Sequence, residues 1–437
     1  MRLKTLVSRL KTLVSLLLLG ASTLASAKEK IIFWHAMGGN FQPTLNKIVE
    51  EYNKSQDKIE VEALYQGSYQ EALNKFKSVQ GTDKAPALIQ LNEISTEYMY
   101  NSGAITPMQE FVKKDNYDLT KLEDTLINYY TINGTLYSMP FNSSASILLY
   151  NKDAFKEVGL DPEKAPKSYK ELAEAAKKLT KGTERYGFAM IMDAWFIEQL
   201  LANENTLYVN EENGRAGKSP TAVAYNGEKI KTIFNWLNDM YRDNTATSYG
   251  KEYQNTRAAF LSGKVSMYID SSAGIQQLTE LANFEIGSAY VPSENGEFTG
   301  VPIGGASLWI TNSVSDEKQA AAWDFVKYAV SKESQALWAS STGYYSVNKE
   351  AYDLDLLKKD LEKTPQKLVA VNEIKDTQKT AATSGAIVGV FPELRKVMTD
   401  SMEKVYVGKE KIDKIIDKMV KESDRIVKRY NRLNSSK

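Results

Sequence analysis

Small amide and hydroxyl side chains that could bind a polar ligand gather at Asn142, Ser143 and Ser144. They follow Pro140 and precede an apolar run and the start of a helix near residue 151, so the pattern predicts a short polar turn between rigid elements. Such groups donate and accept hydrogen bonds, which suits recognition of a hydroxylated solute. The segment therefore indicates binding rather than catalysis.

Three other segments offer polar or aromatic groups where predicted strands end: residues 34–39, the turn Gly67-Ser68-Tyr69, and Asn92-Glu93. Sheets of mostly parallel strands bind ligands outside the carboxyl ends of their strands. Because the three segments follow consecutive strands, we expect them to form one wall of a pocket.

The elements that would position these groups alternate along the first part of the chain. Residues 31–34, 59–63 and 87–91 have the apolar character of strands, and residues 69–80 have the pattern of a helix. Another helix has Pro43 in its first turn, and its apolar residues fall on one face at Leu45, Ile48, Val49 and Tyr52. This alternation of strand and helix predicts right-handed crossovers and a mostly parallel α/β sheet.

Local signals continue downstream. Residues 132–135 have the pattern of an Asn-Gly hairpin, and Ser168 with Glu171 forms a capping box. Residues 257–262 predict a helix ended by Gly263, and residues 265–269 a strand that stops at Asp270-Ser271-Ser272. A Gly turn enters a strand at residues 302–309, and residues 412–427 predict an amphipathic helix. No Pro- or Ser-rich linker separates them. We therefore expect the chain to cross between its domains several times through short strands.

The first 27 residues have the pattern of a secretory signal peptide: a basic region, an apolar core from Leu13 to Leu19, and small residues before a cleavage site after Ala27. The apolar core is shorter than the ~20 residues that a transmembrane helix needs. We expect export to the periplasm. A lipoprotein would need a cysteine at the cleavage site, and the sequence has none.

Length and composition narrow the function further. Removing 27 residues from 437 leaves 410, which is long for one core and predicts two domains. The 55 basic residues match 55 acidic ones, and four basic residues lie in the leader, so the exported chain carries about −4. That charge argues against a nucleic-acid partner. A chain with one histidine and no cysteine gives no basis for a metal site, and no cofactor is expected.

Six motifs in order resemble the extracellular solute-binding proteins of ABC importers, family 1, and in particular its glycerol-3-phosphate-binding members. The resemblance runs from about Lys30 to beyond Phe391. The motifs are Phe33-Trp34-His35-x-Met37, Gly67-x-Tyr69, Asn92-Glu93, Pro140-Phe141-Asn142-Ser143-Ser144, Gly304-Gly305-Ala306-Ser307-Leu308-Trp309 and Thr342-Gly343-Tyr344.

The resemblance implies a two-lobed periplasmic binding protein fold of the class II type. Mixed, mostly parallel sheets would carry helices on both faces, and a hinged cleft would hold the ligand. Residues 28–140 plus 303–350 would form lobe 1, and residues 141–302 plus 351–437 would form lobe 2. The implied partners are a small polar solute and the transmembrane subunits of an ABC permease, and we expect a monomer.

The same resemblance implies a set of ligand contacts: Tyr69, Glu93, Ser144, Trp195, Ser272, Gly304 and Tyr344. A carboxylate and serine hydroxyls suit ligand hydroxyls, and aromatic faces suit carbon skeletons. Purely structural roles stay open for these residues, because a serine side chain can hydrogen-bond within a turn and Trp195 can pack in a hydrophobic core. His35, the one histidine, is expected to be structural.

Two departures from the resemblance bear on the ligand. Family members that bind glycerol-3-phosphate carry an arginine in a Gly-x-Arg-x-Gly stretch, and here residues 385–389 place Ile387 at that position. Where relatives have two tryptophans three apart, this chain has Met192 and Trp195. These two departures predict a less charged or larger ligand, namely a sugar, an oligosaccharide or a glycerophosphodiester. Glycerol-3-phosphate itself stays among the candidate ligands.

A secreted glycoside hydrolase is the alternative function. It would need two carboxylates flanking the bond to be cleaved, and Glu93 with Asp193 or Asp270 could supply them. Turnover of a chromogenic glycoside that Glu93→Gln abolishes would favour this alternative. A structural or adhesive protein is disfavoured because no repeat occurs outside the leader.

Overall fold

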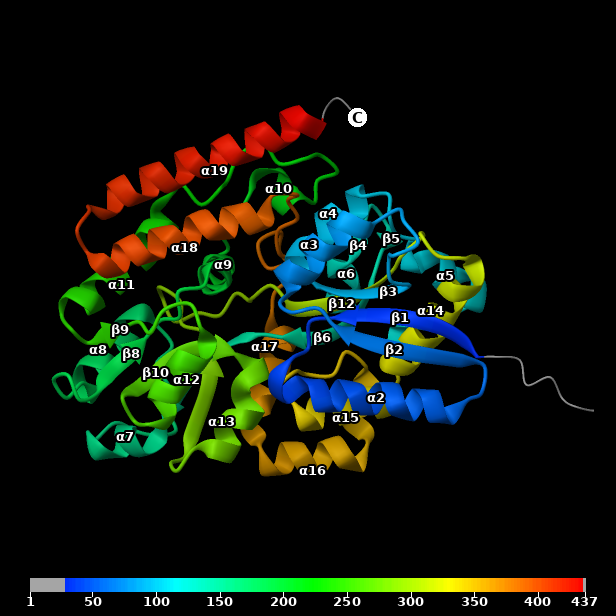
Figure 1. Ribbon diagram of the computed structural model, residues 1–437. Helices are drawn as coiled ribbons and strands as arrows, with labels where there is room; N and C mark the ends of the chain where they lie inside the picture. The colour runs from blue at the N-terminus through cyan, green and yellow to red at the C-terminus, as the bar shows by residue number, and fades with distance from the viewer. Residues whose placement is uncertain (1–27, 435–437) are drawn as a thin grey trace, which may run out of the picture.

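The computed structural model describes residues 28–434 and has two α/β lobes, each built on its own five-stranded sheet (Figure 1). The predicted signal peptide lies outside the described residues. Among residues 28–434, none of the helices combines the length and the hydropathy of a membrane span.

The sheet of lobe 1 has four strands in one direction and one against them, because β12 is antiparallel to both of its neighbours while β1 pairs in parallel with β2 and β3. The late strand β12 therefore lies between the early strands β3 and β6. In order across the sheet, the strands are β2 (Ile59–Tyr65), β1 (Glu29–His35), β3 (Leu88–Asn92), β12 (Gly304–Ile310) and β6 (Met139–Ser144).

The sheet of lobe 2 also has a single reversed strand, since β7 is antiparallel to both β11 and β10, and β10 is parallel to β8. Its strands in order are β11 (Ile286–Tyr290), β7 (Ser146–Asn151), β10 (Val265–Ser271), β8 (Tyr186–Ala189) and β9 (Ala246–Thr247). The expected two-lobed architecture with mixed, mostly parallel sheets is confirmed.

Helices cover both sheets (Figure 1). Those of lobe 1 are α2 (Gln42–Ser55), α3 (Tyr69–Val79), α4 (Thr96–Asn101), α5 (Met108–Asp115), α6 (Asp124–Tyr129), α14 (Asp316–Ala329), α15 (Lys332–Ser341) and α16 (Asp355–Lys363). Those of lobe 2 are α7 (Lys152–Glu157), α8 (Tyr169–Leu179), α9 (Ala194–Asn203), α10 (Asn210–Gly214), α11 (Glu228–Arg242), α12 (Tyr253–Leu261), α13 (Ile275–Leu281), α17 (Leu368–Asp376), α18 (Phe391–Val407) and α19 (Ile412–Asn434).

Local sequence signals explain many of these elements. Helix α2 buries the four apolar residues that the helical spacing predicted. The capping box at Ser168 and Glu171 opens α8 as expected. Asn133 and Gly134 have positive φ angles of 50° and 77°, the geometry of a type I′ turn, and they join β4 (Thr131–Ile132) to β5 (Thr135–Leu136).

The predicted polar turn at residues 142–144 is wrong. These residues are the last three of strand β6, and all of them are buried. The strand continues because β12 pairs with it from Met139 to Ser144, with one irregularity opposite Ala306 and Ser307, and because the amide of Asn142 has partners inside the lobe. Only Ala145 separates β6 from β7, so one residue divides a strand of the first sheet from a strand of the second.

Between residues 28 and 434, the chain passes between the lobes three times. The first passage is at Ala145, the second lies between β11 and β12, and the third follows α16, because α16 packs on α15 whereas α17 packs on β7 and β11. The exact lobe limits remain a proposal. Strand β6 pairs with β12 as far as Ser144, however, which places the first passage after Ser144 rather than at residue 140.

A candidate binding cleft between the two lobes

A pocket of about 360 Å³ lies between the lobes and takes its walls from both. Lobe 1 supplies side chains from strand ends and from the segment after α15, and lobe 2 supplies them from α9, α12, α18 and the end of β10. The lining residues are Phe41, Tyr69, Asn92, Glu93, Ser144, Gly305 and Tyr344 of lobe 1, and Asp193, Trp195, Tyr253, Arg257, Ser271, Ala273 and Arg395 of lobe 2.

Aromatic rings brace the lobe 1 wall. The ring of Tyr344 stacks on Trp338 at 5.7 Å between centroids, and it contacts Phe41 at 5.4 Å. Trp338 is fully buried and also packs on Phe141 of β6. Because rings packed on one another have few alternative rotamers, Tyr344 presents a fixed apolar face to the cleft.

A chain of amide hydrogen bonds holds Tyr69 at the start of α3. The backbone N–H of Ala36 donates to Gln90 Oε1 at 3.0 Å, Gln90 Nε2 donates to Asn142 Oδ1 at 2.7 Å, and Asn142 Nδ2 donates to the Tyr69 hydroxyl at 3.0 Å. The amides are buried on β3 and β6. Asn142 therefore acts through Tyr69, and the strand ends position the residue as the sequence predicted.

Trp195 lies in the first turn of α9, where Asp193 caps the helix by accepting from the Trp195 backbone N–H at 3.0 Å. In the amide orientation that satisfies both partners, Gln199 accepts from the indole Nε1 at 2.9 Å and donates to the Pro302 carbonyl at 3.1 Å. A Cβ on Gly304 would lie 2.5 Å from the indole ring. Glycine is required there so that β12 can approach the tryptophan.

The structure brings most of the expected contacts to one place. Tyr69, Glu93, Ser144, Trp195 and Tyr344 all line the pocket. Gly304 lies beside it, against Trp195 and the Ser144 hydroxyl.

Ser272 is fully buried behind the wall. Its backbone N–H donates to the Ala145 carbonyl at 2.8 Å, and its Oγ accepts from the Ala145 N–H at 3.2 Å. Ser272 thus ties β10 to the first passage between the lobes, while its neighbours Ser271 and Ala273 face the pocket.

An ion-pair cluster on the pocket wall was not expected from the sequence. Arg395 of α18 makes a two-pronged pair with Glu198 of α9, from Nε to Oε1 and from Nη2 to Oε2, both at 2.8 Å. Its Nη2 also donates to Glu93 Oε1 at 2.7 Å. All three residues are mostly buried. The Arg395–Glu93 pair joins lobe 2 to lobe 1, so opening of the cleft would break it.

A second buried pair supports the lobe 2 wall. Arg257 of α12 donates to both oxygens of Asp270, from Nε at 2.8 Å and from Nη2 at 3.0 Å. The Tyr268 hydroxyl and the Ser271 backbone N–H complete the shell of this carboxylate. Nearby, the Tyr253 hydroxyl donates to Asp193 at 2.8 Å. Each carboxylate considered for hydrolysis therefore already has a partner.

Burial changes the acid–base behaviour of the cleft. Loss of solvent raises the pKa of Glu198 to about 7, although Arg395 opposes the shift. Burial also raises the pKa of Glu93, again against the pull of Arg395. In a separate pocket, which Glu97 lines together with residues of lobe 2, burial raises the pKa of Glu97 to about 7. These carboxyl groups bind protons more readily than exposed glutamates do.

We expect the stability of the protein to fall as the pH rises from about 5 to about 8. An unfolded glutamate has a pKa of about 4.3. The Glu198 pKa of about 7 lies above that value, so its protonated form stabilises the folded state. That stabilisation is complete below about pH 4 and is lost as the pH rises through 7. Glu93 and Glu97 act in the same direction.

The thermal midpoint measured across this pH range tests the expectation. The glutamine of the Glu198→Gln variant cannot ionise, so the thermal midpoint of this variant should change less with pH than that of the wild type. Glu60→Gln, at an exposed position, should leave the dependence of the midpoint on pH unchanged. A Glu198→Gln profile as steep as that of the wild type would contradict the assignment.

His35 has the structural role that the sequence predicted. It is fully buried at the end of β1, where its Nδ1 accepts from the Met37 backbone N–H at 3.3 Å. Burial lowers the pKa of His35 to about 4, so the ring is neutral near pH 7. His35 is absent from the described lining of the cleft pocket.

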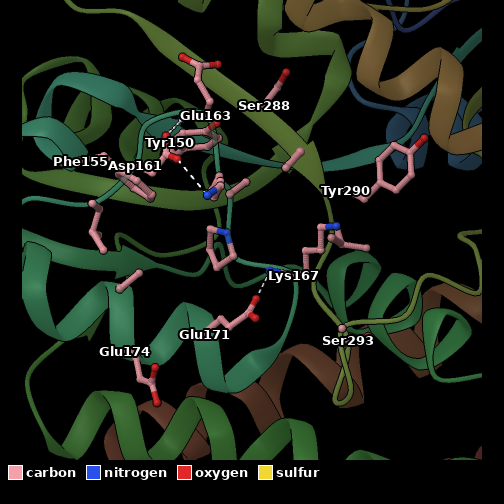
Figure 2. Close-up of a pocket in the computed structure, with 18 of the residues that line it drawn as sticks. Tyr150, Phe155, Asp161, Glu163, Lys167, Glu171, Glu174, Ser288, Tyr290 and Ser293 are labelled. Carbon is pink, nitrogen blue, oxygen red and sulfur yellow. Dashed lines mark hydrogen bonds and ion pairs between the residues drawn. The ribbon is translucent and has the colours of Figure 1, made fainter.

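A larger cavity, of about 1270 Å³, lies elsewhere on lobe 2 (Figure 2). It is bounded by β11, α8 and the segment before α8, where Glu171 accepts from the Lys167 backbone N–H. It shares no lining residue with the cleft pocket. Figure 2 shows its labelled acidic side chains apart from one another, with Glu163 on one side and Glu171 and Glu174 on the opposite side. The volume of the cavity alone does not make it a binding site. Among the described residues, no group of acidic or histidine side chains could hold a metal ion.

Comparison with known proteins agrees with this geometry. A family model described as "Bacterial extracellular solute-binding protein" matches residues 47–366. The sn-glycerol-3-phosphate-binding periplasmic protein UgpB of Yersinia pseudotuberculosis serotype I (strain IP32953) is 31% identical over 419 residues, which cover 94% of this chain and 95% of that protein.

Two solved structures share the fold. UgpB from Mycobacterium tuberculosis, in complex with glycerophosphocholine, has a TM-score of 0.80 and 21% identity, with 92% of this chain and 99% of that chain covered. The cyclic alpha-maltosyl-1,6-maltose binding protein from Arthrobacter globiformis has a TM-score of 0.76 and 20% identity, with 92% and 100% covered.

Proposed function

The chain belongs to the family of bacterial extracellular solute-binding proteins, and from that premise we propose that it captures a polar carbon source between its lobes and delivers it to the permease of an ABC importer. Proteins of this family bind small solutes without converting them, so the chain is a binding protein and not an enzyme. The proposed solutes are a sugar, an oligosaccharide, glycerol-3-phosphate or a glycerophosphodiester.

One observation carries the proposal: side chains from both lobes line the same pocket. Tyr69 and Tyr344 come from lobe 1, and Trp195 and Tyr253 come from lobe 2. Aromatic faces on two bodies that can move apart suit a solute that is clasped between them. The named relatives support the class of solute, since the Yersinia protein is described as binding glycerol-3-phosphate and the Arthrobacter protein as binding a cyclic maltosyl-maltose.

The proposed mechanism is closure around the solute. Each lobe supplies part of the contacts, so the ligand stabilises the closed arrangement through interactions that an open one lacks. Ala145 lies at the first passage between the lobes, where its backbone N–H and carbonyl are hydrogen-bonded to Ser272 of lobe 2. Closure would bend the chain at this passage. We also propose export to the periplasm with cleavage after Ala27, no lipid anchor, and action as a monomer without nucleic acid.

Binding should stabilise the protein and compact it. A solute at 100 times its dissociation constant adds about 2.7 kcal/mol to the free energy of unfolding, so a thermal-shift panel of saccharides, glycerol-3-phosphate and glycerophosphodiesters is expected to give a clear rise with one class. X-ray scattering at saturation should then give a smaller radius of gyration. Tyr69→Ala is the control and should lose both responses. A radius unchanged by a solute that raises the melting temperature would contradict lobe closure.

A further inference from the structure

Both arginines of the cleft pocket are held by carboxylates. Nε and Nη2 of Arg395 are bonded to Glu198, and Nη2 also reaches Glu93. The corresponding edge of Arg257 is bonded to Asp270. The planar edge with which a guanidinium grips a phosphate in two-pronged fashion is therefore already occupied in each case.

The four charged residues that line the pocket balance one another, but the carboxylates of Glu198 and Asp270, which hold its arginines from behind, make the cluster as a whole acidic. We call the following six residues the cleft charge cluster: Glu93, Asp193, Glu198, Asp270, Arg257 and Arg395. Four carboxylates against two guanidiniums give a net charge of −2. Protonation of Glu198 alone would leave −1. In neither state is the cluster positive, and a buried negative site repels a phosphomonoester dianion more strongly than the same charges would in water.

From these pairs we propose that Glu198 is a specificity-determining residue, which occupies Arg395 and so excludes phosphomonoesters, and that the cleft takes a hydroxylated solute without net negative charge. The inference rests on the proposed function and narrows its ligand. Glu198 acts through Arg395 and is absent from the lining of the cleft pocket itself.

The remaining lining fits a neutral or zwitterionic solute. Trp195, Tyr253 and Tyr344 offer aromatic faces, which pack on sugar rings and attract cationic groups such as a quaternary ammonium. The Glu93 and Asp193 carboxylates accept hydrogen bonds from hydroxyl groups. An acidic, aromatic pocket therefore suits a saccharide, or a phosphodiester whose negative charge is balanced by its own cation.

Titration calorimetry on the exported chain and its Glu198→Gln variant tests the inference. The probes are maltose and maltotriose as neutral solutes, glycerophosphocholine as a zwitterion, and glycerol-3-phosphate and sulfate as anions. The wild type is expected to bind a neutral or zwitterionic probe and to bind both anions more weakly. Glu198→Gln releases the guanidinium, so the ratio of anion affinity to neutral affinity should rise at least about tenfold, the value of one charged hydrogen bond.

Glu373→Gln is the matched control, because Glu373 is a fully buried carboxyl of lobe 2 outside the cleft, and it should leave the ratio unchanged. A wild type that prefers glycerol-3-phosphate overturns the inference and leaves solute binding intact. A folded Glu198→Gln with an unchanged ratio also overturns it. If the Glu198→Gln variant does not fold, the preference of the wild type between the neutral or zwitterionic probes and the anions alone tests the inference. If the wild type binds none of the probes, the proposed function is what fails.

Discussion

Replacing Arg257 with methionine is expected to lower the free energy of unfolding by about 3–5 kcal/mol. The change removes a guanidinium that is bonded to both oxygens of Asp270, a carboxylate with no exposed surface. Breaking a buried ion pair on one side leaves an uncompensated buried charge, which costs several kcal/mol. Urea denaturation followed by circular dichroism gives the loss directly.

A double variant separates this cause from a simple loss of packing. Arg257→Met with Asp270→Asn removes both charges, and the asparagine Oδ1 can still accept from the Ser271 N–H or the Tyr268 hydroxyl. The double variant should therefore be more stable than the single one. Lys231→Met, which breaks the exposed Lys231–Asp413 pair, should change stability little. A double variant less stable than Arg257→Met would contradict the explanation.

Trp195→Ala is expected to weaken solute binding by about 2–4 kcal/mol, a rise of roughly 30- to 1000-fold in the dissociation constant. The indole lies between the capped start of α9 and the glycine edge of β12, and its position is fixed by Gln199. A rigid aromatic at the centre of a pocket supplies much of the contact area, and an alanine leaves the space empty. Calorimetry with the solute that gives the largest thermal shift measures the effect.

Trp236→Phe provides the comparison for Trp195→Ala. Trp236 is also a buried tryptophan of lobe 2, but it stacks on Tyr169 in the core at 4.6 Å and lies outside the cleft pocket. Its replacement should leave the dissociation constant unchanged. If Trp195→Ala and the wild type bound the solute with equal affinity, the assignment of Trp195 to the binding site would be wrong.

Features that depend on neighbouring residues could be predicted from the sequence. The buried face of α2, the capping box of α8 and the Asn133-Gly134 hairpin were all predicted, because a helical face, a cap and a positive-φ turn are set within a few residues. The resemblance added the long-range step, since it named Tyr69, Trp195 and Tyr344 from three distant segments, and these line one pocket.

Features that depend on distant partners could not be predicted. Glu198 and Arg395 are 197 positions apart, and nothing near either residue indicates that they pair. The residues around Ser143 were misinterpreted as a turn because amide and hydroxyl groups usually mark loops, whereas here Gln90 and Tyr69 satisfy Asn142 inside the lobe. Ser272 was expected in the pocket, but its hydroxyl is used by the backbone of Ala145.

The three passages of the chain between the lobes have a practical consequence for protein engineering. Neither lobe corresponds to one uninterrupted stretch of sequence, since β12 returns to complete the sheet that β1 began. A gene fragment that stops at Ala145 would lack the central partner of β3 and β6, and should yield aggregated polypeptide instead of an isolated half. A chimera with a relative would have to exchange at least two separate segments at once to keep one sheet intact.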